Sequence, residues 1–153
     1  MTASTTLTFQ PARADDTTAF VALRGQTRQN AISAERLAEL GITAESWAEM
    51  MEEGSLSGVT CDHEGELVGY CFGDLETGEV IVLALLPAYE GQGIGRKLLE
   101  LVVKQLQAKG HRTLFLGCSN DPESRSYGFY RRLGWRPTGA MDKYGDEVLE
   151  YRV

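Results

Sequence analysis

The sequence predicts a single α+β domain, an α/β-like three-layer arrangement in which helices flank a mixed, mostly antiparallel central sheet. Three observations predict this class. The 153 residues match the size of one domain, which we expect to span 1–153. The segment 80–86 is apolar at every position, as in a strand covered on both faces. An amphipathic helix is predicted at 95–109, with segments of strand periodicity on both sides of it.

The N-terminal third predicts one strand and then helices. Apolar and polar residues alternate at 7–9, which indicates a strand. Asp15 or Asp16 can cap a helix around the apolar residues 20–23. Ser33–Glu52 has loosely helical apolar spacing, which predicts one interrupted helix or two short ones.

Three strands are predicted in the middle of the chain, at 59–61, 67–72 and 80–86, separated by turn-forming residues. Because 80–86 is continuously apolar, we expect it to be a central strand. The long helix at 95–109 follows it and ends at Gly110.

The C-terminal part predicts a strand at 114–118, a helix at 123–133, and two last strands at 135–138 and 147–153. The order of elements is therefore β-α-α-β-β-β-α-β-α-β-β. Strands that follow one another directly favour antiparallel pairing, and the helices between the others cover the sheet.

Composition excludes several classes of protein. The 15 basic and 22 acidic residues give a net charge of −7, which argues against a nucleic-acid partner. No apolar run reaches the roughly 20 residues of a membrane span, and the segment 1–10 lacks the pattern of a secretory signal. Three widely spaced cysteines, Cys61, Cys71 and Cys118, are typical of reduced thiols, so we expect a cytoplasmic location.

A glycine-rich loop is the most informative feature of the chain. The sequence LLPAYEGQGIGRK joins the apolar strand to the long helix and contains Gly91, Gly93 and Gly95. Glycines leave the backbone N–H groups accessible, and a helix N-terminus adds unpaired donors and partial positive charge. Arg96 and Lys97 are unfavourable for the helix dipole unless an anion lies nearby. The loop therefore predicts a phosphate site.

Two common nucleotide-binding motifs do not fit this loop. A dinucleotide fingerprint that starts at Gly91 would need glycine at Arg96. A P-loop needs Gly-Lys followed by Ser or Thr, and this loop reads Gly-Arg-Lys. The spacing thus disfavours a nucleotide-binding redox protein.

With this loop and the later sequence SYGFYRRLGW, the chain resembles the GNAT family of N-acetyltransferases. The resemblance covers nearly the whole chain and is strongest over Leu83–Pro137. Gly93 and Gly95 match the family's pyrophosphate loop, Arg/Gln-x-x-Gly-x-Gly/Ala, whereas Glu90 stands where Arg or Gln is usual. Tyr130 aligns with the tyrosine of the family's Phe-Tyr-x-x-Leu-Gly-Phe signature.

The resemblance implies an acetyltransferase-type fold and an enzyme that transfers an acetyl group from acetyl-coenzyme A. The acceptor would be a primary amine of a small molecule or peptide, attacking directly in a ternary complex. The alternative function is a non-catalytic acyl-CoA-binding sensor on the same fold. The residues expected to bind the cofactor are Leu85, Leu86, Gly91, Gln92, Gly93, Ile94, Gly95, Arg96, Lys97, Asn120 and Ser126.

Acetyl transfer to an amine also needs proton transfers. Tyr130 is the predicted acid for the leaving thiolate, because a phenol is protonated at pH 7. Glu79, Asp74 or a water molecule could be the base that accepts the amine proton. We expect no metal, because the spacing of the histidines and cysteines matches no common site.

The acceptor site is expected in the N-terminal helical region, as the resemblance implies. Arg28, Asn30 and Trp47 are the predicted substrate contacts there. Arg28 would suit an acceptor that carries a carboxylate. The sequence leaves the acceptor and the oligomeric state open, including a homodimer.

Overall fold

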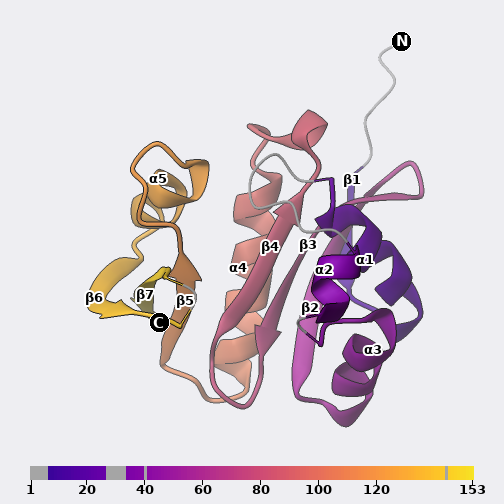
Figure 1. The fold of residues 1–153 in the computed structure, drawn as a ribbon, viewed down its shortest axis with the longest axis horizontal. Coiled ribbons are helices and arrows are strands. Elements are labelled where there is room, and N and C mark those ends of the chain that lie inside the picture. Colours follow the sequence, from indigo (N-terminus) through magenta and orange to yellow (C-terminus); the bar gives the residue numbers. More distant parts are fainter. Residues whose placement is uncertain (1–6, 27–33, 40, 144) are drawn as a thin grey trace.

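The computed structural model describes residues 7–26, 34–39, 41–143 and 145–153 (Figure 1). Two antiparallel sheets lie side by side. The first has the strand order β1-β2-β3-β4 and the second the order β5-β7-β6. The strands of the first sheet are β1 (Leu7–Pro11), β2 (Leu56–His63), β3 (Glu66–Asp74) and β4 (Val80–Leu85). Those of the second are β5 (Thr113–Cys118), β6 (Arg136–Met141) and β7 (Glu147–Arg152).

Helices cover both faces of the first sheet (Figure 1). One face contacts α4, and the other contacts α1 and α3. The helices are α1 (Thr17–Arg24), α2 (Ala34–Glu39), α3 (Ala44–Glu53), α4 (Ile94–Ala108) and α5 (Arg125–Arg132), with short 3₁₀ turns at η1 (Ala14–Asp16) and η2 (Pro87–Tyr89). The predicted α+β class, a mostly antiparallel sheet flanked by helices, is confirmed.

Alternation along β3 divides the core into two clusters. Cys71 faces the cluster under α4, which includes Leu98. Tyr70 and Phe72 point the opposite way and pack with Phe20 of α1 and other aromatic rings. Successive side chains of a strand alternate between its faces, so one short segment serves both cores.

Several boundaries differ from the sequence predictions. Among the described residues beyond α1 the chain forms α2 and α3, in agreement with the predicted alternative of two short helices, and α3 begins at a capping box in which Thr43 and Ser46 exchange hydrogen bonds. Asp16 occupies the N-cap of α1, but its side chain makes no capping hydrogen bond. The 3₁₀ turn η1 continues directly into α1, so the backbone already has a helical turn where α1 begins. The predicted cap Ser33 lies outside the described residues.

The prediction of a central strand at 80–86 is wrong in one respect, because β4 is the edge strand of the first sheet. The apolar sequence of β4 indicates that helices cover both faces of the strand. It does not indicate whether the strand lies in the middle or at the edge of the sheet. The pairing with β3 is irregular, since Phe72 pairs with Val82 and Gly73 with Val80. Ile81 lies in this bulge and is 43% exposed.

A buried hydrogen bond ties α1 to the sheet and gives a stability prediction. Tyr70 is 1% exposed, and its hydroxyl donates to the Phe20 carbonyl at 3.1 Å. Tyr70→Phe should lower the free energy of unfolding by about 1–2 kcal/mol in urea titrations. The partly exposed Tyr151 is the control, and Tyr151→Phe should change stability by less than about 0.5 kcal/mol. Equal effects of the two changes would contradict a contribution from the Tyr70 hydrogen bond.

Candidate active site

In the part of the chain that the structure describes, backbone pairing joins the two sheets only near the beginning of β4 and β5. Glu79 and Phe115 form an isolated parallel bridge, and the Phe115 N–H donates to the Gly78 carbonyl at 3.2 Å. Within the described residues no further pairing joins these strands, so they separate toward their C-terminal ends. A gap therefore opens between the ends of β4 and β5, and both α4 and α5 begin beside it (Figure 1).

The open edge of β4 directs backbone groups into this gap. The N–H of Leu86 donates to the Val68 carbonyl at 2.9 Å, that is, toward β3. Alternate residues of an antiparallel strand point their N–H groups to opposite sides. The N–H groups of Leu85 and Leu83 consequently face away from β3, toward the gap. An extended ligand could hydrogen-bond to this edge as an added strand does.

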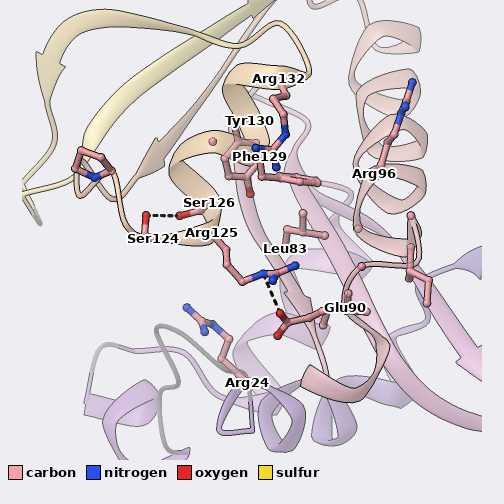
Figure 2. Close-up of a pocket in the computed structure, with 17 residues that line it drawn as sticks. Arg24, Leu83, Glu90, Arg96, Ser124, Arg125, Ser126, Phe129, Tyr130 and Arg132 are labelled. Atoms are coloured by element: carbon pink, nitrogen blue, oxygen red, sulfur yellow. Dashed lines mark hydrogen bonds and ion pairs between the residues drawn. The ribbon is translucent and has the colours of Figure 1, made fainter.

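A cavity of about 720 Å³ occupies the gap (Figure 2). It runs from the glycine loop and the first turn of α4, across the end of β4, to α5. The residues that line it are Arg24, Leu83, Leu85, Glu90, Gly91, Gly93, Ile94, Gly95, Arg96, Pro122, Ser124, Arg125, Ser126, Gly128, Phe129, Tyr130 and Arg132.

The glycine loop forms an open cradle at one end of the cavity. Gly91 and Gly93 have φ values of 76° and 80°, which favour glycine, and a Cβ on either would meet no atom within 4 Å. Gly93 is the N-cap of α4 and provides no side-chain cap. The first intrahelical bond joins the Lys97 N–H to the Gly93 carbonyl at 3.1 Å. The N–H groups before it have no acceptor within the helix, so this end of the cavity fits a phosphate.

The charge of the lining also fits an anionic ligand. Among the described lining residues, four arginines, Arg24, Arg96, Arg125 and Arg132, stand against one carboxylate, Glu90. This local excess of positive charge occurs in a chain of net charge −7. Clefts lined by one sign of charge attract ligands of the opposite sign.

Tyr130 lies on the α5 wall of the cavity beside Phe129 (Figure 2). The two rings are 5.1 Å apart, and the Tyr130 side chain is largely buried. Burial raises the pKa of the phenol, and the neighbouring Cys71 and Cys118 raise it further. In the described part of the chain no residue hydrogen-bonds to its hydroxyl. The group is therefore protonated at neutral pH and able to donate a proton to a bound ligand.

Glu79 lies immediately before β4 and is not among the residues that line the cavity. Leu83 lies four positions further along the chain, which corresponds to about 13 Å along a strand. Burial raises the pKa of the Glu79 carboxyl, and Asp74 and Asp142 raise it further. Its carboxylate is thus more basic than that of an ordinary glutamate.

Some predicted cofactor residues do not reach the cavity. Leu86 uses its N–H within the sheet. Gln92 is exposed and donates its side-chain amide to the Ala88 carbonyl at 3.4 Å. Lys97 and Asn120 are exposed and are not among the residues that line the cavity. The predicted residues that do line it are Leu85, Gly91, Gly93, Ile94, Gly95, Arg96, Ser126 and Tyr130.

The predicted acceptor residues have a different outcome. The structure places Trp47 in the hydrophobic core, where its ring lies 4.8 Å from that of Phe72 and is 7% exposed. Packing thus explains Trp47, and the structure does not bring it to the cavity. Arg28 and Asn30 lie outside the described residues.

Several lining residues are not among those that the sequence predicts. Arg125, Phe129 and Arg132 occupy positions i, i+4 and i+7 of α5, so helical periodicity could have identified this face. Ser124, the N-cap of α5, accepts a hydrogen bond from the Tyr127 N–H at 3.3 Å. No local sequence pattern predicts that Arg24 lines the cavity, because only the packing of α1 on the sheet brings it near β4.

Neither a membrane span nor a metal centre is found among the described residues. None of the helices in the described ranges combines the length and apolar character of a membrane span. Among the same residues, no three His, Cys, Asp or Glu side chains gather as metal ligands do.

Comparisons with known proteins agree with this geometry. A protein of Bacillus subtilis named "Putative ribosomal protein bS18-alanine N-acetyltransferase" is 28% identical over 109 residues, which cover 66% of this chain and 70% of that one. The PaiA N-acetyltransferase of Thermoplasma acidophilum, solved in complex with coenzyme A, has a similar fold with a TM-score of 0.79 at 16% identity, covering 97% of this chain and 99% of that one. The ribosomal-protein-S18-alanine N-acetyltransferase of Escherichia coli gives a TM-score of 0.66 at 18% identity, over 95% and 91% of the chains.

The sequence profile of the acetyltransferase (GNAT) family matches residues 19–135, which include most of α1, the glycine loop and α5. The match spans most of the chain and both ends of the cavity. The chain therefore belongs to the acetyltransferase (GNAT) family and is an N-acetyltransferase.

Proposed function

We propose that the chain transfers an acetyl group from acetyl-coenzyme A to a primary amine of a small molecule or peptide, by direct attack in a ternary complex. The observation that carries this proposal is one cavity that is lined both by the glycine loop at the N-terminus of α4 and by the buried Tyr130. We infer that the loop would bind phosphate and that Tyr130 would donate a proton within the same site. The family of the chain and the coenzyme A bound to its structural neighbour support the choice of donor.

The donor supplies a thioester, and the protein positions it. The backbone N–H groups at Gly93–Arg96 would hold the pyrophosphate at the N-terminus of α4. The N–H groups of Leu83 and Leu85, on the open edge of β4, would pair with the amides of the pantetheine arm. One of these donors could also stabilise the negative charge that develops on the carbonyl oxygen.

Two proton transfers complete the reaction. The amine nitrogen forms a bond to the acetyl carbon, and the bond from that carbon to sulfur breaks. Tyr130 would give its proton to the departing thiolate, and the amine proton would pass to a base. Glu79 is the proposed base, acting through water because of its distance from Leu83. Asp74, the alternative base, already accepts hydrogen bonds from the backbone N–H groups of Glu76 and Thr77.

The acceptor is proposed to approach where β4 and β5 begin to separate. Asp142 acts electrostatically on Glu79 and lies against Gly117 of β5, so both carboxylates lie near this opening. Negative charge attracts a protonated amine before it is deprotonated for attack. Relatives are named for acetylating an alanine of a ribosomal protein, which makes a peptide N-terminus one candidate acceptor.

Turnover in the presence of amines tests whether the chain is an enzyme of this kind. Release of free thiol from acetyl-coenzyme A should depend on an added amine, and a panel should include polyamines, aminoglycosides and peptides with N-terminal alanine. Acyl-CoA binding without turnover on any amine would support the sensor instead.

Replacing Glu79 tests its role as the base. Glu79→Gln should lower kcat near pH 7 by about 10²-fold and recover partly at high pH, where the amine loses its own proton. Since the pKa of Glu79 is raised, the acid limb of the wild-type pH–rate profile should lie above that of an ordinary glutamate. Asp142→Asn removes a negative neighbour and should move this limb to lower pH.

Glu76 provides the matched control, because it is an exposed glutamate in the adjoining turn. Glu76→Gln should leave the pH–rate profile unchanged. A wild-type profile in Glu79→Gln would assign the base to water or to Asp74.

A further inference from the structure

Glu90 places a carboxylate directly before the glycine loop. Its side chain is only 13% exposed and lines the cavity next to Gly91 and Gly93. A carboxylate here lies close to where a phosphate would bind the N-terminus of α4. Like charges in a partly buried site repel, so an uncompensated Glu90 would weaken the binding of a phosphate.

The opposite wall provides the compensating charge. Arg125, the first residue of α5, pairs through Nε with Oε2 of Glu90 at 2.9 Å. Figure 2 shows this ion pair extending between the two walls of the cavity. A guanidinium this close to a carboxylate offsets its negative charge.

We propose that Arg125 is a positioning residue for coenzyme A, which makes the glycine loop competent for the pyrophosphate by neutralising Glu90. The two residues act as one unit, and this inference depends on the proposed donor. Arg125 matters mainly because Glu90 is present. When Glu90 is removed, the repulsion disappears and the need for Arg125 falls with it.

A double-mutant cycle measures this dependence. Binding of coenzyme A is followed by calorimetry for the wild type, Arg125→Gln, Glu90→Gln and the double variant. Arg125→Gln should weaken binding about tenfold or more, a size typical of coupled charges. Glu90→Gln should bind at least as tightly as the wild type, and the double variant should bind within about threefold of Glu90→Gln.

Arg96 provides a matched control, because it lines the same cavity from α4 and pairs with Glu100 instead. Arg96→Gln should have the same effect with and without Glu90. High salt should reduce the coupling between Glu90 and Arg125, because Arg125 is 58% exposed. Thermal melts of all variants establish that they are folded.

Three results would overturn the proposal. The first is an equal loss of affinity from Arg125→Gln in both backgrounds, and the second is no loss from Arg125→Gln in the wild type. The third is a Glu90→Gln variant that binds more weakly than the wild type. A wild-type protein that does not bind coenzyme A would overturn the proposed donor as well, whereas the three results above leave that donor intact.

Discussion

Tyr130→Phe should lower kcat by roughly 10²–10⁴-fold, the usual contribution of a positioned acid. The change removes only the hydroxyl, and the ring keeps its contacts with Phe129 and Trp135. Because burial raises the pKa of this phenol, the wild-type group is protonated throughout the neutral range. Steady-state kinetics with acetyl-coenzyme A and an active amine would measure the effect.

Two measurements separate this role from a packing role. Calorimetry should give nearly the same affinity for acetyl-coenzyme A in Tyr130→Phe and in the wild type, and circular dichroism should be unchanged. A less stable variant that turns over normally per folded molecule would show that Tyr130 is a core aromatic. Tyr130→Phe should slow turnover most for those less reactive amines for which breakage of the carbon–sulfur bond limits the rate.

Gly95→Glu should abolish binding of coenzyme A while the protein remains folded. A Cβ at Gly95 would meet Phe129 at 3.7 Å and Leu83 at 3.8 Å, which are ordinary contact distances. The helix therefore tolerates a side chain at this position, but the glutamate would extend into the cavity and bring negative charge to the phosphate site. Calorimetry measures the binding, and circular dichroism the fold.

Gln107→Glu is the control for added charge, because Gln107 is exposed near the other end of α4. This variant should bind coenzyme A as the wild type does. Unchanged affinity in a folded Gly95→Glu variant would contradict the assignment of the loop to the pyrophosphate.

Local patterns predict the part of the site that is built locally. The apolar strand, the glycines and the amphipathic helix follow one another in the sequence, so the sequence alone predicts that Gly91, Gly93 and Gly95 form one wall of the cavity. Tyr130 is found in the same way, from a short signature on one helix. These groups depend on backbone conformation and helical periodicity, which a single sequence records well.

Contacts between distant segments cannot be predicted in this way. The apolar pattern of β4 shows that both faces are covered, but the single bridge to β5 depends on how the two sheets meet. Glu90 is visible as a departure from the family motif, whereas its partner Arg125 comes from another wall of the cavity. Trp47 is predicted at the acceptor site but lies in the core, because a sequence does not show which large aromatic fills a core.

Among the described residues one backbone bridge joins the two sheets, and this also affects how the molecule would respond to a ligand. In the described ranges few backbone hydrogen bonds join the β5–β7 sheet to β4, although the two sheets share a hydrophobic core, so amide hydrogen exchange should be a sensitive reporter of this junction. A ligand held by β4, α4 and α5 at once would link the two parts. By thermodynamic linkage, a ligand at 100 times its Kd adds about 2.7 kcal/mol to the stability of the bound state. A bound ligand would therefore add contacts between the two sheets beyond those that the backbone hydrogen bonds provide.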